Sequence, residues 1–508
     1  MTVEKQSNKK SLIDDQVKMK ELPVKKYGEF WYSDLPDKLG ERKWHIDHRK
    51  FIEHLRCSGF HRYDINDDYI FIQIKLRIIE EIPITRFKDE VIYYINNLNS
   101  KNLGGITREQ LLSMFYTSPD TYFNSSKLSM LGLKKNLILN TDTKESGFIY
   151  YSNGFVKCTA DDYQLYPYNQ LDGYVFRKQV KDRKFIKGPS EGMFKKFTSN
   201  ITGANEQRLK SLQTIIGYLL HSFFEAEIKA VSLTDSNISE DAEGRTGKTL
   251  IGYAISHIKN VCEISGKSFK ADNKHRYESA KIDSQIIFLN DLEKNFDFEC
   301  LFNDISDRIT VDRKNRDPFT IRAKMLIAAN DTFRVEGESA KARLFEFELA
   351  NYYNKEFTPK KEMGAWFFSN DWDENEWLRF DNFMVECLSL YLKHGVIEAA
   401  PINLEKRHQL GAIKNRDIIE FFDNKIDRKE LIRNIEYDKR KLHEEFLDQY
   451  PDYKEDRFYK RSANFTKHLK IYAAYSPELK GEISERRTDG RYLIRFEKKE
   501  ANQQKLQI

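Results

Sequence analysis

Cysteine is scarce in this chain, and its pattern excludes two kinds of stabilised scaffold. The 508 residues include only five cysteines, and no two of them form a Cys-x-x-Cys pair. This pattern does not fit a zinc ribbon or a disulfide framework, and it predicts free thiols in a reducing compartment. The five are Cys57, Cys158, Cys262, Cys300 and Cys387.

Long apolar runs and a strong excess of one charge are also missing. No apolar run approaches the length of a membrane-spanning helix, and residues 1–20 are polar without the apolar centre of a signal peptide. We therefore expect a cytoplasmic protein with no membrane partner. The formal net charge is only +5, so any surface that binds nucleic acid must be local.

The chain does contain enough apolar material for a large core. Hydrophobic residues make up 40% of the sequence and aromatic residues 13%. At this length we expect more than one domain. Helical and strand patterns after a polar tail at residues 1–28 predict an α+β domain, including a helix begun by a Thr107–Gln110 cap and a hairpin over residues 147–158.

A glycine-rich loop between a strand and a helix is the most informative feature. Residues 229–234 have the pattern of a buried strand, and the apolar run of residues 250–255 predicts a helix. Between them lies a phosphate-binding pattern. Its residues are Gly244, Arg245, Thr246, Gly247, Lys248 and Thr249.

The residue types of this loop suit the binding of ATP and Mg²⁺. Glycines let backbone N–H groups close around an anion, and the helix N-terminus adds partial positive charge. Lys248 can reach the β- and γ-phosphates, and Thr249 can offer its hydroxyl to Mg²⁺. Ala242 stands where a further glycine is usual. The alternative is a glycine-rich turn that meets a lysine by chance.

A second strand, residues 284–289, ends in Asn290 and Asp291. A buried strand that delivers a carboxylate to its end is the expected partner of a phosphate loop, because the acid then lies beside Mg²⁺. Two acids in a row are usual, so Asp291 must carry most of the charge here, and Glu293 is a possible helper. An ordinary strand end is the alternative.

A third strand, residues 323–329, ends in Asn330. It follows Asp291 at about the interval that separates Asp291 from Lys248. An amide at such a strand end can orient the attacking water and sense the γ-phosphate.

Two basic features accompany these strands. Residues 308–319 predict a hairpin with a basic tip, made by Arg313, Lys314 and Arg316, for which a solvated charge run is the alternative. Arg343 comes just before a strand, and its planar charged group suits the γ-phosphate of a neighbouring subunit. A surface ion pair with Glu346 is the other reading of Arg343, and Arg334 is the reserve candidate.

The C-terminal segment predicts a winged helix. Its pattern is three helices followed by a hairpin with a basic tip, where Arg487 and Arg491 are candidate DNA contacts. The predicted helices are residues 427–435, 441–449 and 462–471, the last begun by Ser462 as its cap, and the hairpin strands are 482–487 and 491–496.

With these motifs in order, the chain resembles superfamily 3 helicases, and among them the poxvirus-type primase-helicase branch of phages, satellites and integrative elements. The specific resemblance covers residues 194–396. No primase carboxylate pair is evident, so the resemblance implies a helicase without its own primase. The family's residues correspond to Lys248 and Thr249 (Walker A), Asp291 (Walker B), Asn330 (sensor), Lys314 (pore hairpin) and Arg343 (arginine finger).

The resemblance implies an α/β P-loop (AAA+-like) ATPase core, with an α+β N-terminal domain and a C-terminal winged-helix domain. The expected boundaries are a tail at 1–28, the N-terminal domain at 29–190, the ATPase at 191–400, the winged helix at 401–497 and a disordered tail at 498–508.

The function we expect is an ATP- and Mg²⁺-dependent DNA helicase. It would act as a ring, by family resemblance a hexamer, that moves on single-stranded DNA, contacts duplex DNA through its winged helix and works with a separate primase or initiator. The main alternative is an ATP-switched initiator that binds an origin and unwinds little, which Asn290 favours. A P-loop kinase of a small molecule is a third reading, against which the terminal winged helix argues.

Overall fold

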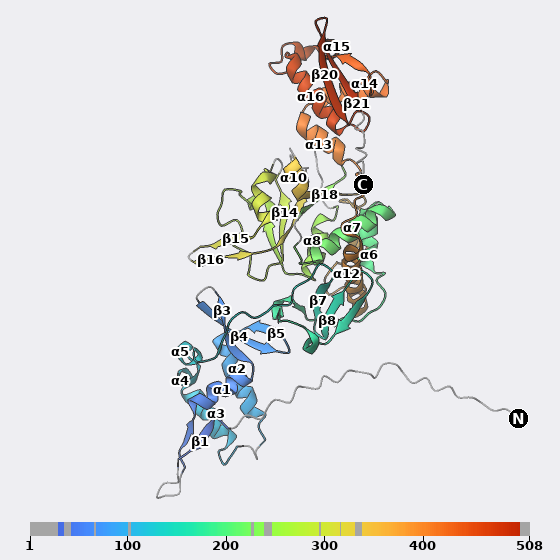
Figure 1. Cartoon of the computed structure of the whole chain (residues 1–508). Coiled ribbons are helices and arrows are strands. Elements are labelled where there is room, and N and C mark those ends of the chain that lie inside the picture. Colours follow the sequence, from blue (N-terminus) through green and yellow to red (C-terminus); the bar gives the residue numbers. More distant parts are fainter. Residues whose placement is uncertain are drawn as a thin grey trace, which may run out of the picture. The chain divides into compact units, whose positions relative to one another are not determined.

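The computed structural model describes residues 29–34, 42–65, 68–99, 103–224, 228–237, 246–293, 296–314, 316–330 and 338–497. The chain divides into two compact units, of which the first comprises residues 1–140 and 171–177 and the second residues 141–170 and 178–508 (Figure 1). The predicted tails and the loop residues Ala242, Gly244 and Arg245 lie outside the described residues, as does Arg334.

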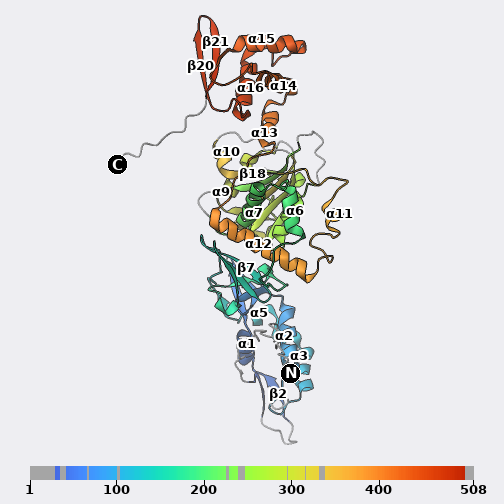
Figure 2. The same ribbon diagram turned by 90° about the vertical axis from the view of Figure 1, so that its right-hand side faces the viewer.

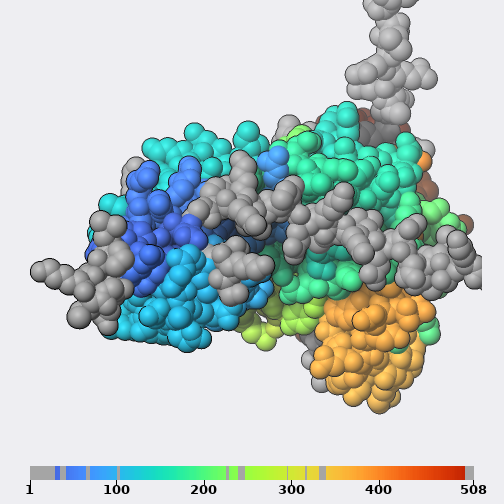
Figure 3. All heavy atoms as spheres, turned by 90° about the horizontal axis from the view of Figure 1, so that it is seen from below, coloured from blue at the N-terminus to red at the C-terminus, as the bar shows by residue number. Residues whose placement is uncertain are grey.

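The first unit is a mixed α/β structure, and Figure 3 shows one side of it in blue and cyan. Its main sheet has five strands in the order β10-β5-β4-β3-β6, and β1 pairs with β2 in a separate ribbon. Its core combines aliphatic residues with aromatic ones, which include Phe30, Phe51, Phe60, Phe87 and Phe115. The elements are β1 (Trp31–Ser33), β2 (Trp44–Ile46), α1 (His48–Cys57), β3 (Phe60–Ile65), β4 (Asp68–Lys75), β5 (Ile78–Glu81), α2 (Ile84–Asn96), α3 (Arg108–Thr117), α4 (Pro119–Phe123), α5 (Ser125–Leu128), β6 (Leu133–Lys134) and β10 (Val175–Phe176).

Helix α3 begins as the sequence predicts. The Thr107 side chain accepts from the backbone N–H of Gln110, and the Gln110 side chain accepts from the backbone N–H of Thr107. This capping box satisfies two N–H groups that a helix start otherwise leaves without partners.

A small sheet of four strands opens the second unit, in the order β11-β7-β8-β9. It belongs to the following α/β structure, because Tyr151 and Val156 share a core cluster with the helices α7 (Glu206–Leu220) and α12 (Glu374–His394). The unit therefore begins well before residue 191, the boundary expected from the sequence. The predicted hairpin is confirmed as β7 (Gly147–Tyr151) and β8 (Gly154–Cys158), followed by β9 (Tyr163–Tyr166) and β11 (Val180–Lys181).

The centre of the second unit is a parallel sheet of five strands in the order β13-β14-β17-β12-β18. Both faces are covered, because alternate residues of each strand enter different core clusters. Phe288 joins the cluster that contains residues of α7, α12 and the helix α8 (Lys248–Ser256). Leu289 joins the other cluster, with residues of η5 (Phe298–Leu301), α9 (Phe302–Ser306) and β15 (Ile309–Arg313). The strands are β12 (Ala230–Asp235), β13 (Val261–Ser265), β14 (Ile286–Leu292), β17 (Lys324–Ala329) and β18 (Leu344–Leu349).

Helices cover this sheet (Figure 2), and a hairpin and short helical turns complete this part of the chain. The strands expected over 229–234, 284–291 and 323–330 are confirmed within a residue or two as β12, β14 and β17. The surrounding elements are α6 (Met193–Ile201), α7 (Glu206–Leu220), α8 (Lys248–Ser256), η5 (Phe298–Leu301), α9 (Phe302–Ser306), β15 (Ile309–Arg313), β16 (Arg316–Ile321), α10 (Glu338–Arg343), α11 (Pro359–Met363) and α12 (Glu374–His394).

The last part of the second unit has its own core of aromatic and aliphatic residues, with Phe422, Phe446 and Phe465 buried together. Four helices and a three-stranded sheet in the order β19-β21-β20 enclose it. The elements are α13 (Leu404–Ile413), α14 (Arg416–Asp427), β19 (Glu436–Asp438), α15 (Lys439–Gln449), α16 (Ser462–Tyr475), β20 (Glu482–Thr488) and β21 (Arg491–Glu497).

Two predictions for this part were wrong in detail. The helix expected over residues 427–435 is absent from these described residues, because α14 ends at Asp427 and the backbone N–H groups of Glu430 and Leu431 turn back to the carbonyl of Lys425. Ser462 is not the cap of α16 but its first residue, and Arg461 at the cap position makes no side-chain capping bond. The predicted helix over 441–449 and the hairpin are confirmed as α15, β20 and β21.

Candidate functional site

The N-terminus of α8 faces the ends of the central strands. Gly247 caps this helix with a φ of 109°, in the left-handed region that favours glycine. A side chain there would also collide with Phe197, because a Cβ would lie 2.5 Å from the Phe197 ring. The N–H groups and the partial positive charge at the start of α8 therefore lie at this end of the sheet, where an anion can bind.

Lys248, the first residue of α8, is buried and points at two strand ends. Its Nζ donates to Oδ2 of Asp235 at 2.5 Å and to Oδ1 of Asn330 at 3.0 Å. The hydroxyl of Thr246 donates to the other oxygen of Asp235. Burial lowers the pKa of the Lys248 ammonium, and the Asp235 carboxylate partly offsets that effect.

Sequence reasoning did not single out Asp235, which it assigned to the loop after β12. The residue is the last of β12 and is only 3% exposed. An acid that ends a buried strand was the signal used for Asp291, and the same signal was present here.

Thr249 and Asn290 lie side by side. The Thr249 hydroxyl donates to Oδ1 of Asn290 at 3.2 Å, and Nδ2 of Asn290 donates to Oε1 of Glu263 at 2.8 Å. Glu263 lies on β13, the edge strand beside β14, and sequence reasoning did not select it. Its contact depends on strand pairing, which the sequence alone does not show.

A bulge in β14 determines the direction of the Asp291 side chain. The register with β17 shifts between Leu289 and Leu292, and Asp291 has a φ of 59°. Such a bulge adds a residue and re-aims side chains, so neighbouring residues need not alternate between faces. Oδ1 of Asp291 then accepts from Nδ2 of Asn330 at 3.4 Å, and Oδ2 contacts the Lys267 ammonium at 2.8 Å, which raises the pKa of Lys267.

The oxygen atoms in this region suit Mg²⁺. Thr249 offers a hydroxyl, Asn290 an amide oxygen and Asp291 a carboxylate, all of them hard donors. Among the described residues, no group of three or more His, Cys, Asp or Glu side chains could hold a metal by itself. Mg²⁺ usually needs only one or two protein carboxylates, because phosphates and water complete its coordination, so the donor set is compatible with it.

Helix α13 contributes an arginine to the same strand ends. The Arg407 guanidinium donates from Nη1 to the carbonyl of Asp235 and from Nη2 to the carbonyl of Asn330. Nearby, Nδ2 of Asn403 donates to the carbonyl of Ser236 at 2.8 Å. Neither residue was predicted, because α13 itself was not expected from the sequence.

The other two residues predicted for catalysis lie outside this cluster. Glu293 follows the end of β14 and is exposed. Arg343 ends α10, before the N-terminal end of β18, and therefore lies at the other edge of the parallel sheet from Lys248. Its Nε donates to the Ser306 hydroxyl at 2.9 Å, and its guanidinium lies 5.1 Å from the centre of the Phe302 ring.

The predicted hairpin is present as β15 and β16. Its tip carries Lys314, whose side chain is exposed. The backbone N–H of Lys314 donates to Oε1 of Glu278 at 3.4 Å. Arg313 lies 4.8 Å from the centre of the Phe319 ring. Arg316 begins β16, and its side chain lies outside the described part of the structure.

The β20–β21 hairpin also has an exposed basic tip. Arg487 lies 5.0 Å from the centre of the Tyr492 ring, and Arg440 of α15 lies 4.3 Å from the same ring. Arg491 begins β21 and is exposed. Cationic groups and one aromatic ring therefore gather on this hairpin.

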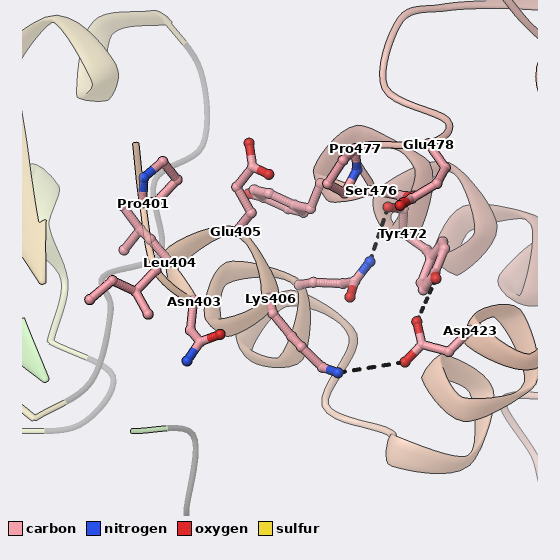
Figure 4. A pocket seen from close by; sticks show the side chains of 13 residues that line it. Pro401, Asn403, Leu404, Glu405, Lys406, Asp423, Tyr472, Ser476, Pro477 and Glu478 are labelled. Carbon is pink, nitrogen blue, oxygen red and sulfur yellow. Dashed lines mark hydrogen bonds and ion pairs between the residues drawn. The ribbon is translucent and has the colours of Figure 1, made fainter. Parts of the chain in front are cut away.

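A pocket of about 330 Å³ lies elsewhere, between the start of α13 and the end of α16 (Figure 4). Its polar groups bind one another. The Tyr472 hydroxyl donates to Asp423 at 2.5 Å, and Nε2 of Gln409 donates to the carbonyl of Tyr472 at 3.2 Å. These contacts explain the pocket as part of the packing around α13.

Comparison with known proteins gives matches among solved structures only. No protein-family model and no curated protein matches this chain. Solved structures that are similar include three of the apo C-terminal region of NrS-1, with sequence identities of 12%, 12% and 13% and TM-scores of 0.38, 0.36 and 0.39. Each alignment covers 88% of this chain and 98% of the other. These scores are too low to support an argument about function.

The described helices include none that is both long and apolar enough to cross a membrane.

Proposed function

We propose that this chain is a P-loop ATPase of the AAA+-like class that drives a DNA helicase. The observation that carries the proposal is the convergence of three strand ends on the start of α8. Asp235 of β12 and Asn330, just after β17, bind Lys248, while Asn290 of β14 binds Thr249. In a parallel sheet the carboxyl ends of the strands share one edge, and nucleotides bind at that edge in open α/β sheets.

Each residue has a task that its geometry supports. The N–H groups at the start of α8 and the Lys248 ammonium would bind the phosphates, and Thr249, Asn290 and Asp291 would hold Mg²⁺. Bound ATP and Mg²⁺ supply a phosphoanhydride bond and a cation that stabilises the charge that develops on its cleavage. Asp291 and Asn330, joined by a hydrogen bond of 3.4 Å from Nδ2 to Oδ1, would hold and orient a water molecule.

Two basic hairpins support DNA as the partner. Lys314 at the tip of β15–β16 would contact the backbone of a single strand, which gives binding that tolerates any sequence. The helix and strand order of the last part of the chain is compatible with a winged helix, in which Arg487 and Arg491 of the hairpin would contact duplex DNA.

A ring is the assembly that would bring Arg343 to a phosphate. Within one chain Arg343 lies at the opposite sheet edge from Lys248, so it can reach a γ-phosphate only in a neighbouring subunit. The contacts with Ser306 and Phe302 would have to be exchanged for the phosphate when subunits assemble.

A second candidate function is an ATP-switched initiator that binds DNA and unwinds little. Asn290 favours it, because an amide replaces one of two acids that support hydrolysis. Steady-state hydrolysis of ATP with and without single-stranded DNA, together with displacement of a strand from a forked duplex, separates the two. Stimulated hydrolysis and displacement, both lost in Lys248→Ala, support the helicase. Tight nucleotide binding without turnover would favour the initiator, and no nucleotide binding would refute both.

A further inference from the structure

We propose that Glu263 supplies the negative charge that is missing at Asn290, so that the two side chains together replace one acid of the magnesium site. This inference rests on the proposed nucleotide site and assigns a positioning role to a residue outside its motifs. It starts from the hydrogen bonds that join Thr249, Asn290 and Glu263.

The strand pairing brings Glu263 to the correct side of the sheet. In the parallel register of β13 and β14, Glu263 lies opposite Phe288, and Ser265 lies opposite Asn290. Phe288 packs under α8, because a Cβ on Gly252 of that helix would lie 2.4 Å from its ring. Glu263 and Asn290 therefore share the face of the sheet against which α8 packs, and Thr249 lies in the first turn of that helix.

The hydrogen bonds determine which way the Asn290 amide points. A carboxylate can only accept a hydrogen bond, so the Nδ2 group must face Glu263, as the 2.8 Å distance to Oε1 requires. The Oδ1 atom must then face Thr249, whose hydroxyl donates to it at 3.2 Å. With its proton directed to Asn290, the Thr249 oxygen keeps its lone pairs for a cation.

Glu263 also supplies the negative charge that the neutral Asn290 lacks. A neutral amide oxygen is a weaker ligand for Mg²⁺ than a carboxylate, and Mg²⁺ favours sites with charged oxygen ligands. Asn290 and Glu263 together carry one negative charge, as a single aspartate would. Charged partners of a metal ligand raise the basicity of that ligand and fix its orientation. Glu263 is exposed, so water can also join it to a cation.

The test is the Mg²⁺ dependence of nucleotide binding, measured by the anisotropy of a fluorescent ADP during titration of Mg²⁺ from an EDTA baseline. Glu263→Gln keeps an acceptor for Asn290 and removes the charge, so the Mg²⁺ midpoint should rise about tenfold, as for other partners of metal ligands. Affinity without Mg²⁺ should not change. Glu80→Gln, at an exposed position of β5, is the matched control and should behave as the parent.

A double variant sharpens the result. Asn290→Asp places the acid directly at the site, so adding Glu263→Gln to it should not raise the midpoint further. A midpoint for Glu263→Gln within about twofold of the parent, well below the rise of about tenfold expected for a partner of a metal ligand, would overturn the inference. Loss in Glu263→Ala but not in Glu263→Gln would overturn the charge role and leave only a hydrogen bond. A parent that binds no ADP would overturn the proposed function and this inference with it.

Discussion

Replacement of Asp235 by asparagine tests how the phosphate loop is held without nucleotide. Asp235 and Lys248 form a buried ion pair at 2.5 Å, with side chains 5% and 10% exposed, and Asp235 also accepts from Thr246. Removing one partner of such a pair leaves an uncompensated buried charge, which costs about 3–5 kcal/mol. Asparagine keeps one acceptor oxygen, so we expect a loss near the lower end, about 3 kcal/mol of unfolding free energy.

The same substitution should strengthen nucleotide binding. In the parent protein, phosphates must draw Lys248 away from Asp235, whereas in Asp235→Asn they are its only anionic partner. A substitution that destabilises only the nucleotide-free protein makes the free energy of binding more favourable by the same amount, and each 1.4 kcal/mol raises the affinity about tenfold. We therefore expect at least about tenfold tighter ADP binding at pH 7 and a larger rise in Tm on adding ADP.

Chemical denaturation with and without ADP and equilibrium binding of ADP measure both effects. Asp142→Asn is a suitable control, because Asp142 also pairs with a buried lysine, Lys259 at 3.6 Å, but contacts none of the loop residues named above. Its unfolding free energy should fall without a gain in ADP affinity. If Asp235→Asn is destabilised but binds ADP no more tightly than the parent, the ion pair persists in the bound state and the reasoning is refuted.

Three further predictions address other parts of the chain. Burial lowers the pKa of His54 to about 4, and its Nε2 has no hydrogen-bond partner. Because the unfolded state takes up the proton first as pH falls from 6.5 to 4, protonation of His54 should lower the free energy of unfolding by about 3 kcal/mol over that range. Chemical denaturation of His54→Leu at the two pH values should not show this loss. Arg407→Ala should weaken ADP binding severalfold, because the carbonyls of Asp235 and Asn330 lose the guanidinium that binds both of them. Duplex DNA binding should be retained. Equal loss of both activities in binding assays would instead indicate that the variant is unfolded. Lys314→Ala should reduce the slope of the logarithm of the single-strand binding constant against the logarithm of salt concentration by about 0.7, and it should uncouple ATP hydrolysis from unwinding. If the variant unwinds normally, the tip of this hairpin is only a solvated charge run.

Much of the central sheet could be predicted from the sequence, because its strands are continuous apolar runs that end in polar residues. Asn290, Asp291 and Asn330 were selected in this way, and the structure places all three near Lys248 or Thr249. Their roles in catalysis stay predictions. The glycine pattern likewise located the start of α8 correctly.

The missed contacts depend on tertiary structure. Glu263 meets Asn290 only because β13 pairs with β14, and Arg407 reaches Asp235 from a helix about 170 residues further along the chain. No local pattern encodes such contacts. The bulge at Asp291 is a further example, because a φ of 59° is uncommon for any residue other than glycine and the apolar pattern of the strand does not predict it.

Equilibrium binding of a fluorescent, non-hydrolysable ATP analogue tests the central claim most directly. The assay compares the parent, Lys248→Ala and Lys210→Ala, the last at an exposed lysine of α7 that pairs with Glu206. We predict saturable, Mg²⁺-strengthened binding by the parent and Lys210→Ala, and binding weaker by at least about tenfold in Lys248→Ala, because a charge-assisted contact with phosphate is lost. Binding of the analogue by Lys248→Ala with the affinity of the parent would show that the nucleotide site is not at the start of α8.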